Sequence, residues 1–201
     1  MFRFLETIRI KDGTKQLDGY HLKRMKRTLG TVPLPFSVIE FSKILQVPKN
    51  LQSVTVKARL LYDANGYDIG FEAYTKRDIR RIILKDADTL VYDKKYADRS
   101  QLNILTNGLL PEEDVLIIKN GLVTDTSYCN VAFTDGAKWY TPNMPLLHGT
   151  QRAYLLRKKM IHPKRISVLD ISSYSHIRLF NAMIPWDEAI ELEVEESIVR
   201  M

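Results

Sequence analysis

The sequence predicts an α+β fold with two lobes, a small N-terminal α+β lobe and a larger C-terminal lobe of mixed β structure. Segments in which apolar and polar residues alternate recur along the chain, and this alternation is typical of strands. Turn pairs such as Asn120-Gly121 separate neighbouring strand segments. A short Asp-Ala-Asp joint divides the chain into residues 1–86 and 87–201.

The small lobe is expected to begin with a strand over residues 4–10, where β-branched and apolar residues alternate with polar ones. Asp18 is placed to cap a helix over residues 20–29, whose apolar residues form one stripe, and Gly30 is placed to end it. Ser37 is placed to cap a second helix.

Pro48 ends this second helix, because proline cannot continue the helical hydrogen bonding. Three strand candidates follow, at residues 53–62, 67–74 and 80–84. The turn at residues 63–66, which contains Asn-Gly, predicts that the first two form an antiparallel hairpin.

The larger lobe combines two predicted helices with several short strands. One helix is expected over residues 100–109, and another begins at Gly149 or Thr150 and ends at Met160. The strands are expected at residues 115–119, 122–125, 130–134, 138–141, 166–169, 175–180 and 190–194.

The composition is that of an ordinary globular protein, with 45% hydrophobic and 27% charged residues in a chain of 201. No apolar segment approaches the roughly 18 residues of a membrane span, and no signal peptide is apparent. The single cysteine, Cys129, excludes an internal disulfide and favours a cytoplasmic protein. No zinc-ligand spacing is present, so no metal is expected.

The net charge of +6 fits either nucleic-acid binding or a preference for anionic ligands. The basic residues are spread along the chain with acidic residues between them, and no repeated aromatic platform accompanies them. This pattern favours a basic surface that attracts anionic ligands over a nucleic-acid-binding protein.

Three short segments carry the functional prediction. Lys95 lies before a predicted helix, and Asp125 ends a predicted strand. Further on, the turn at residues 147–152 opens a helix with free backbone amides, which favour an anion. An amine, a carboxylate and an anion cradle are the parts needed to hold an aldehyde cofactor that carries a phosphate.

The order of these segments resembles the fold-type IV pyridoxal-phosphate enzymes, the class IV aminotransferase family. Residues 4–9 resemble the family's FETIR strand, and residues 21–25 resemble its HLxRL helix. The segment Lys-Tyr-Ala-Asp-Arg at residues 95–99 resembles the reactive-lysine segment. From Asp125 onward, the chain resembles the family signature, which ends in the phosphate turn at residues 147–152.

The resemblance implies pyridoxal 5′-phosphate as the cofactor and a two-lobed fold like that of D-amino-acid aminotransferase. Lys95 would be the catalytic lysine that holds the cofactor, and Asp125 would partner the pyridine nitrogen, where the family usually carries Glu. Gly149, Thr150 and Gln151 would bind the phosphate through backbone amides, with Gln151 at the usual threonine position. Arg24 would be the charged partner of the phosphate.

The resemblance also implies an activity. Arg99 lies four residues after Lys95, as in the Lys-x-x-x-Arg of the lyase branch, and would bind a substrate carboxylate. The expected enzyme is therefore similar to aminodeoxychorismate lyase, acting on a small-molecule amine as a homodimer without nucleic-acid or membrane partners. Two alternatives stay open: a branched-chain or D-amino-acid aminotransferase, and a non-catalytic protein that binds a cofactor or nucleic acid.

Overall fold

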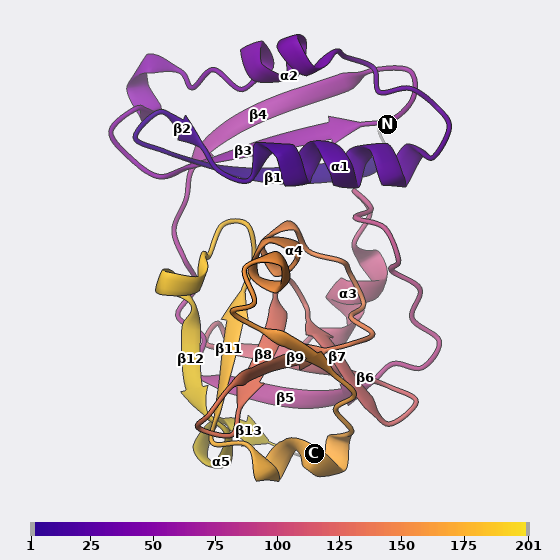
Figure 1. Cartoon of the computed structure of the whole chain (residues 1–201), viewed down its shortest axis with the longest axis vertical. Coiled ribbons are helices and arrows are strands. Elements are labelled where there is room, and N and C mark those ends of the chain that lie inside the picture. Colours follow the sequence, from indigo (N-terminus) through magenta and orange to yellow (C-terminus); the bar gives the residue numbers. More distant parts are fainter. Residues whose placement is uncertain (1–2, 200–201) are drawn as a thin grey trace. The chain divides into compact units, whose positions relative to one another are not determined.

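The structure is a computed structural model that describes residues 3–199, and it divides into two compact units (Figure 1). The first unit contains the residues up to Thr75 together with Lys94–Asp98, and the second contains Lys76–Asp93 together with the residues from Arg99 onward. Within residues 3–199, no helix is both long enough and apolar enough to cross a membrane.

The first unit is built on a four-stranded sheet in the order β2-β1-β3-β4. Its strands are β1 (Phe4–Lys11), β2 (Thr14–Lys15), β3 (Val56–Tyr62) and β4 (Tyr67–Ala73). The three longer strands are antiparallel neighbours, and the predicted hairpin at residues 63–66 joins β3 to β4. Phe4 pairs with Tyr62 and Ile10 with Val56, so the apolar side chains of β1 and β3 share one face.

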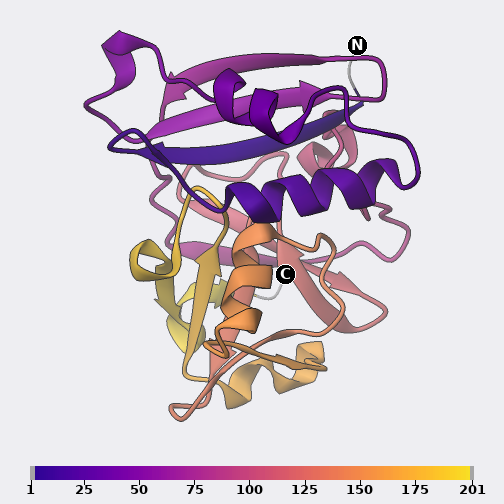
Figure 2. The same cartoon turned by 45° about the horizontal axis from the view of Figure 1, so that its top comes forward.

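Helices cover this apolar face of the first sheet. They are α1 (Asp18–Leu29), α2 (Val38–Ile44) and the 3-10 helix η1 (Lys49–Leu51). The α1 helix runs alongside β1 in both views (Figures 1 and 2). The core includes Ile8 of β1, Met25 of α1, Phe41 of α2 and Leu60 of β3, and all four side chains are buried.

The segment Lys94–Asp98 is attached to the edge of β1. The amide of Leu5 donates to the carbonyl of Lys95 at 2.9 Å, and the amide of Ala97 donates to the carbonyl of Arg3 at 3.0 Å. Lys95 is therefore built into the first unit, whereas the sequence placed it in the lobe of residues 87–201. Three changes of unit, after Thr75, Asp93 and Asp98, replace the single joint expected at residue 86.

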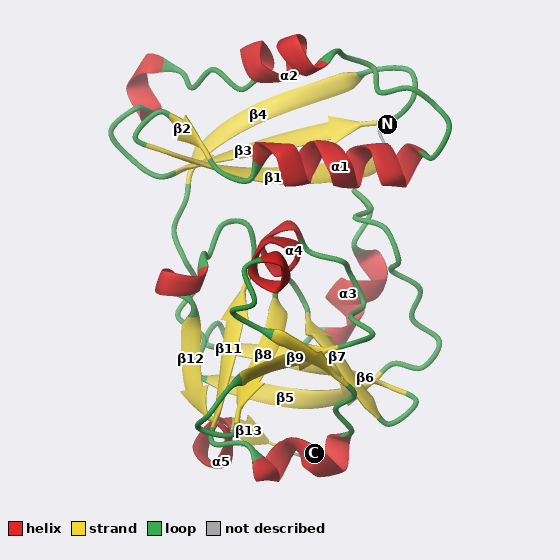
Figure 3. Cartoon of the chain, viewed as in Figure 1, coloured by secondary structure: helices red, strands yellow, loops and turns green. Residues whose placement is uncertain are grey.

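The second unit contains two sheets, which Figure 3 shows together with its short helices. One has the order β13-β5-β6-β7 and the other the order β10-β9-β8-β11-β12. The strands of the first are β5 (Arg81–Asp86), β6 (Glu113–Lys119), β7 (Leu122–Thr126) and β13 (Ile198–Val199). Those of the second are β8 (Asn130–Thr134), β9 (Trp139–Pro142), β10 (His162–Lys164), β11 (His176–Phe180) and β12 (Ile190–Glu193).

The strand β5 lies in the second unit, although the sequence grouped its residues with the antiparallel sheet of the small lobe. It pairs in parallel with β6 and with β13. Its central residues Ile82 and Ile83 are both buried, as expected of a strand covered on two faces. A parallel partner lies far along the chain, so no local turn marks this pairing in the sequence.

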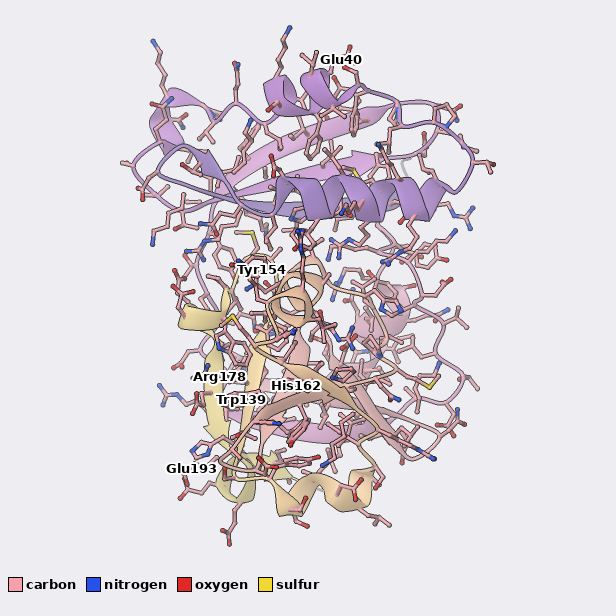
Figure 4. All side chains as sticks on the ribbon, in the orientation of Figure 1. Glu40, Trp139, Tyr154, His162, Arg178 and Glu193 are labelled. Carbon is pink, nitrogen blue, oxygen red and sulfur yellow. The ribbon has the colours of Figure 1, made fainter. Side chains whose placement is uncertain are left out.

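The helix α4 (Thr150–Arg157) packs on the second sheet of this unit. Leu155 of α4 joins Ala132 of β8 and Phe180 of β11 in a buried cluster. At the margin of this cluster, the Arg178 guanidinium lies 4.6 Å from the ring centres of both Trp139 and Trp186. Figure 4 labels Trp139, Arg178 and Tyr154 in this region. This packing fixes the direction of α4 and hence the position of its N-terminus.

The remaining elements are short helices: α3 (Ser100–Leu105), α5 (Val194–Ser197), η2 (Val168–Ser173) and η3 (Trp186–Glu188). The predicted strand at residues 166–169 is wrong from Val168 onward, because Ser167 and Asp170 form a reciprocal capping box that starts η2. The α3 helix ends four residues earlier than expected. The α1 helix is preceded by Leu17 in the left-handed region, with φ 58°, and Asp18 is its first residue rather than its cap.

The predicted cap of α2 is confirmed and can be tested. The Ser37 side chain accepts a hydrogen bond from the Glu40 amide, and the Glu40 carboxylate accepts one from the Ser37 amide. Replacing Ser37 with Ala removes one of these bonds and should lower the free energy of unfolding by about 1 kcal/mol. Chemical denaturation measures the difference, and Ser53→Ala, at an exposed position outside any helix, should leave stability unchanged.

Candidate functional site

The Asp125 carboxylate is the centre of a buried hydrogen-bond network in the second unit. Its Oδ1 accepts from the Asn130 side-chain amide at 2.8 Å, and its Oδ2 accepts from the Leu147 backbone amide at 2.7 Å. The same Asn130 amide donates to the Leu147 carbonyl at 2.9 Å. Both backbone groups of Leu147 are thus held by the pair Asp125 and Asn130, which ties the predicted ring partner to the predicted phosphate turn.

A tight turn between β7 and β8 brings Asp125 and Asn130 together. The Thr126 amide donates to the Cys129 carbonyl at 2.9 Å, and the Thr126 hydroxyl accepts from the Cys129 amide at 3.0 Å. The Asn181 side-chain amide also donates to the Tyr128 carbonyl at 3.1 Å. The turn is therefore held both by its own hydrogen bonds and by a residue from elsewhere in the chain. The chain reverses within four residues, and the side chains at its two ends reach each other.

Gly149 follows Leu147 and lies directly against Asn130. A Cβ atom added to Gly149 would stand 1.9 Å from Asn130 Oδ1, far inside van der Waals contact. The backbone of Gly149 is in the ordinary extended region, with φ −65° and ψ 148°, so its need for glycine is one of space rather than of conformation. The turn can therefore approach Asn130 only because residue 149 has no side chain.

The N-terminus of α4 offers donors that no side chain caps. Gly149 is the N-cap residue and has no side chain that could cap the helix. Thr150 and Gln151, in the first turn, are buried. The Thr150 hydroxyl is buried without a hydrogen-bond partner in the described part of the chain. Arg152 links the start of α4 to the end of β9, because its side chain donates to the Thr141 hydroxyl at 3.2 Å and to the Pro142 carbonyl at 2.7 Å. Amides, a helix dipole and an unsatisfied hydroxyl suit a phosphate group.

The charge on Asp125 is only partly compensated within the second unit. Burial raises the pKa of Asp125 to about 6, although the bonds from Leu147 and Asn130 and the charge of Arg152 oppose the rise. A cation placed beside a buried carboxyl such as Asp125 would lower its pKa and stabilise it, because an adjacent positive charge favours the ionised form.

The first unit contains a second buried cluster, formed by β1 and α1. Arg24 donates through Nε to Glu6 Oε1 at 2.8 Å and through Nη2 to Glu6 Oε2 at 2.5 Å. The Nδ1 atom of His21 lies 2.6 Å from Glu6 Oε2. Burial alone would raise the pKa of Glu6, but Arg24 and His21 outweigh it and lower that pKa to about 2. Burial lowers the pKa of His21, so the ring is neutral and Nδ1–H donates to Glu6.

Lys95 lies near this cluster, and the neighbouring Lys94 does not share its environment. The charge of Lys95 contributes to lowering the pKa of His21, which places its amine within electrostatic range of the ring. The Lys94 ammonium instead lies 5.7 Å from the ring centre of Phe4. The chain bends here, with the Tyr96 amide donating to the Lys94 carbonyl at 2.9 Å, and the two lysines meet different partners.

The predicted site residues thus fall into two groups. Asp125, Gly149, Thr150 and Gln151 lie in the second unit, and Arg99 belongs to the same unit, where its Nη2 donates to the Ser127 carbonyl at 2.7 Å. Lys95 and Arg24 belong to the first unit, and Arg24 is held in its ion pair with Glu6.

Sequence reasoning missed three residues that shape these groups. Glu6 holds Arg24 and His21, Asn130 holds Asp125, and Arg152 holds the start of α4. For Glu6, the available signal was a charged residue on the same strand face as Phe4 and Ile8, a position that requires a buried counter-charge.

The family described as amino-transferase class IV matches residues 108–187. An uncharacterised protein of Haemophilus influenzae is 35% identical over 185 residues, which are 91% of this chain and 98% of that protein. A provisionally named 4-amino-4-deoxychorismate lyase of Haemophilus somnus 129PT has a solved structure with 32% identity and a TM-score of 0.82, covering 92% of this chain and 98% of that one.

The chain belongs to the class IV aminotransferase family. It is therefore an enzyme of a pyridoxal-phosphate-dependent family whose members act on small-molecule amines or amino acids. The expected fold-type IV architecture is confirmed. The pyridoxal-phosphate-bound form of a hypothetical aminotransferase from Mycobacterium tuberculosis shares the fold at 18% identity, with a TM-score of 0.75, covering 100% of this chain and 84% of that one.

The close approach of Gly149 to Asn130 makes a sharp prediction. Replacing Gly149 with Ala forces the two side chains apart and should lower the free energy of unfolding by about 2 kcal/mol, a typical cost of overpacking. Thermal and chemical denaturation measure the change. Gly19→Ala is the matched control, because a Cβ at that exposed helical position meets nothing and should leave stability equal or slightly higher.

A double-mutant cycle then tests whether the clash is the cause. In an Asn130→Ala background, the space beside residue 149 is vacant, so adding Gly149→Ala should cost far less than it does in the wild type. An equal cost in both backgrounds would contradict the proposed contact.

The ion pair of Glu6 predicts a pH dependence of stability. Because the pKa of Glu6 falls from 4.5 to about 2 on folding, its contribution is present above pH 4.5 and is lost as the pH falls towards 2. A shift of this size corresponds to about 3 kcal/mol. The difference in unfolding free energy between wild type and Glu6→Gln should therefore shrink over this pH range. Glu72→Gln, which removes an exposed carboxyl from β4, is the control for the loss of one charge.

Proposed function

We propose that this protein is a pyridoxal-phosphate-dependent lyase similar to aminodeoxychorismate lyase, which converts 4-amino-4-deoxychorismate to 4-aminobenzoate and pyruvate. The observation that carries the cofactor assignment is the Asp125 network. It connects a buried carboxylate to the backbone of Leu147, the first residue of the proposed anion-binding turn, and so combines a partner for a ring nitrogen with a cradle for a phosphate.

The residues of the second unit fit the cofactor in two further respects. The buried, unsatisfied Thr150 hydroxyl and the uncapped amides of α4 suit the phosphate. The raised pKa of Asp125 suits a carboxyl that pairs with a protonated ring nitrogen when the cofactor is bound. Gln151 supports this cradle through its backbone, so the loss of the usual threonine side chain at this position is tolerated.

Lys95 is the proposed reactive amine, and Arg24 is the proposed charged partner of the phosphate. Lys95 would hold the cofactor and would also take the proton from the substrate carbon that carries the amine. Bound pyridoxal phosphate supplies the electron sink for that carbon. Glu6 fixes the plane of the Arg24 guanidinium, which we assign to the phosphate.

A lyase outcome requires that the bond to the leaving oxygen break after the proton is removed. The pyruvate portion leaves, takes up a proton and becomes pyruvate, and the ring that remains is aromatic. Two observations favour this outcome: the four-residue spacing from Lys95 to Arg99 and the 32% identity to the provisionally named lyase. Arg99 is proposed to receive a substrate carboxylate, since its guanidinium makes no ion pair in the described chain.

The aminotransferase alternative uses the same residues with a different fate for the proton. Lys95 would then act as the acid that returns the proton, and the product would be a keto acid. The low-identity neighbours named as aminotransferases share the fold alone, and the structural contacts of Lys95 and Asp125 fit this reaction equally well. Substrate assays decide between the two.

Covalent trapping tests the assignment of Lys95. Borohydride reduction of the protein with pyridoxal phosphate should abolish the visible absorption and add the pyridoxyl mass at Lys95. The Lys95→Ala variant should show no covalent label, whereas Lys94→Ala, its immediate neighbour, should be labelled like the wild type. Labelling of the Lys95→Ala variant would refute the assignment, and a colourless protein that ignores added pyridoxal phosphate would refute the cofactor.

Product analysis tests the reaction. With 4-amino-4-deoxychorismate, we expect 4-aminobenzoate and pyruvate in equal amounts, and Lys95→Ala should lower the rate by more than ~100-fold, as for loss of a general base. Keto-acid formation from branched-chain or D-amino acids with 2-oxoglutarate, without lyase turnover, would favour the aminotransferase. Steep salt-dependent binding of RNA or DNA without cofactor binding would favour a nucleic-acid-binding protein.

A further inference from the structure

A cavity of ≈ 380 Å³ lies within the second unit, beside the turn that follows Asp125. Its polar lining comes from Arg77, Arg99, Asn103, Thr106, Ser127 and Tyr128, together with Glu113. Its volume falls within the range of small-molecule sites, which begins at about 300 Å³. Two of the lining residues, Ser127 and Tyr128, belong to the turn that brings Asp125 to Asn130.

Two arginines face this cavity without a carboxylate partner. Arg77 donates through Nη2 to the carbonyls of Pro111 and Glu113, and Arg99 donates through Nη2 to the Ser127 carbonyl. In the part of the chain that the structure describes, neither guanidinium forms an ion pair. Four other arginines, at positions 24, 80, 81 and 178, each pair with Asp or Glu. Two positively charged guanidinium groups therefore line the cavity. Their hydrogen bonds to backbone carbonyls hold them in place but supply no negative charge.

The nearest carboxyls do not neutralise these arginines. Glu113 lines the cavity, but its Oε1 pairs with Arg81 at 3.4 Å and its Oε2 accepts from the Leu110 amide at 3.1 Å. Asp114 interacts electrostatically with Arg77, and burial raises the pKa of the Asp114 carboxyl. An incoming anion would meet two guanidinium groups whose hydrogen bonds, among the described residues, go to backbone carbonyls.

The rest of the wall is apolar and aromatic. Leu109, Leu110 and Pro111 contribute to it, and the Arg77 guanidinium lies 5.3 Å from the ring centre of Tyr128. Stacking on this ring fixes the guanidinium plane, and a fixed plane favours planar anions that accept two parallel hydrogen bonds. An apolar wall opposite two guanidinium groups suits an acid with an apolar body better than a fully hydrated inorganic ion.

We propose that this cavity binds the carboxylate of a small organic acid with an aromatic or apolar body, and that Arg77 is a second carboxylate-binding residue beside Arg99. Binding of such an acid does not depend on the proposed lyase reaction. The proposal rests on the proposed function only if the acid is the substrate or product, for which Arg99 has been proposed as a contact. A separate acid that regulates the enzyme would be recognised by the same chemistry.

Titration calorimetry with benzoate on the full-length protein, saturated with pyridoxal phosphate, tests the proposal. Benzoate should bind, and the neutral isostere benzamide should not. Arg77→Gln should weaken benzoate binding about tenfold, the equivalent of one charge-assisted hydrogen bond. Arg80→Gln is the matched control, because it removes the same charge from an exposed residue outside the cavity lining.

A second variant keeps the test valid if Arg77→Gln fails to fold. Asn103→Asp is nearly isosteric at an exposed position and adds a negative charge to the cavity wall, so it should also weaken benzoate binding. Asn143→Asp makes the same change at an exposed position outside the cavity and should have no effect. Equal binding by Asn103→Asp and the wild type, or equal binding of benzoate and benzamide, would overturn the proposal.

Turnover assays on Arg77→Gln distinguish the two sources of the acid. A lower kcat/KM together with weaker benzoate binding would assign the cavity to the substrate, and an unchanged kcat/KM with weaker binding would assign it to a separate acid. Benzoate binding by Arg77→Gln that is as tight as binding by the wild type would overturn the site itself. Borohydride trapping at Lys95 is independent of these results, so failure of the cavity proposal and failure of the proposed function are distinguishable.

Discussion

The arrangement of the second unit depends on one carboxylate, that of Asp125. Its two oxygens bond to Asn130 and to the backbone of Leu147, so strand β7, strand β8 and the loop before α4 meet at a single side chain. The hydrophobic packing of Leu155 sets the direction of α4, but the Asp125 network sets where its first turn begins. A carboxylate at this position serves the structure whether or not it also partners a ring nitrogen.

The two units treat a buried acid in opposite ways. Glu6 has a bidentate arginine and a histidine donor, and the pKa of its carboxyl falls to about 2. Asp125 has only uncharged donors in direct contact, and its pKa rises to about 6. A fully paired acid is typical of a structural ion pair, whereas an acid whose charge is incompletely balanced is typical of a ligand site. This contrast supports the ligand assignment for Asp125 and a positioning role for Glu6.

Local signals in the sequence predicted the hairpins, the cap of α2 and the order of the segments that surround Asp125 and Gly149. These features depend on residues close together in the chain, such as Ser37 with Glu40. Features that depend on distant residues were missed: the parallel pairing of β5 with β6, the attachment of Lys95 to β1, and the bond from the Leu147 amide to Asp125. Val168 belongs to a 3-10 helix because the capping box outweighs the apolar pattern on which the strand prediction was based.

The attachment of Lys94–Asp98 to β1 has a consequence for dissecting the protein. Because the first unit is discontinuous, no single cut releases it whole. A fragment ending at residue 75 or 86 would lose the segment that bonds to Arg3 and Leu5, and would expose that edge of β1. The complementary fragment would carry Lys95 without the strand that holds it. Separate expression of the two halves should therefore yield an aggregation-prone piece and an amine without its structural support.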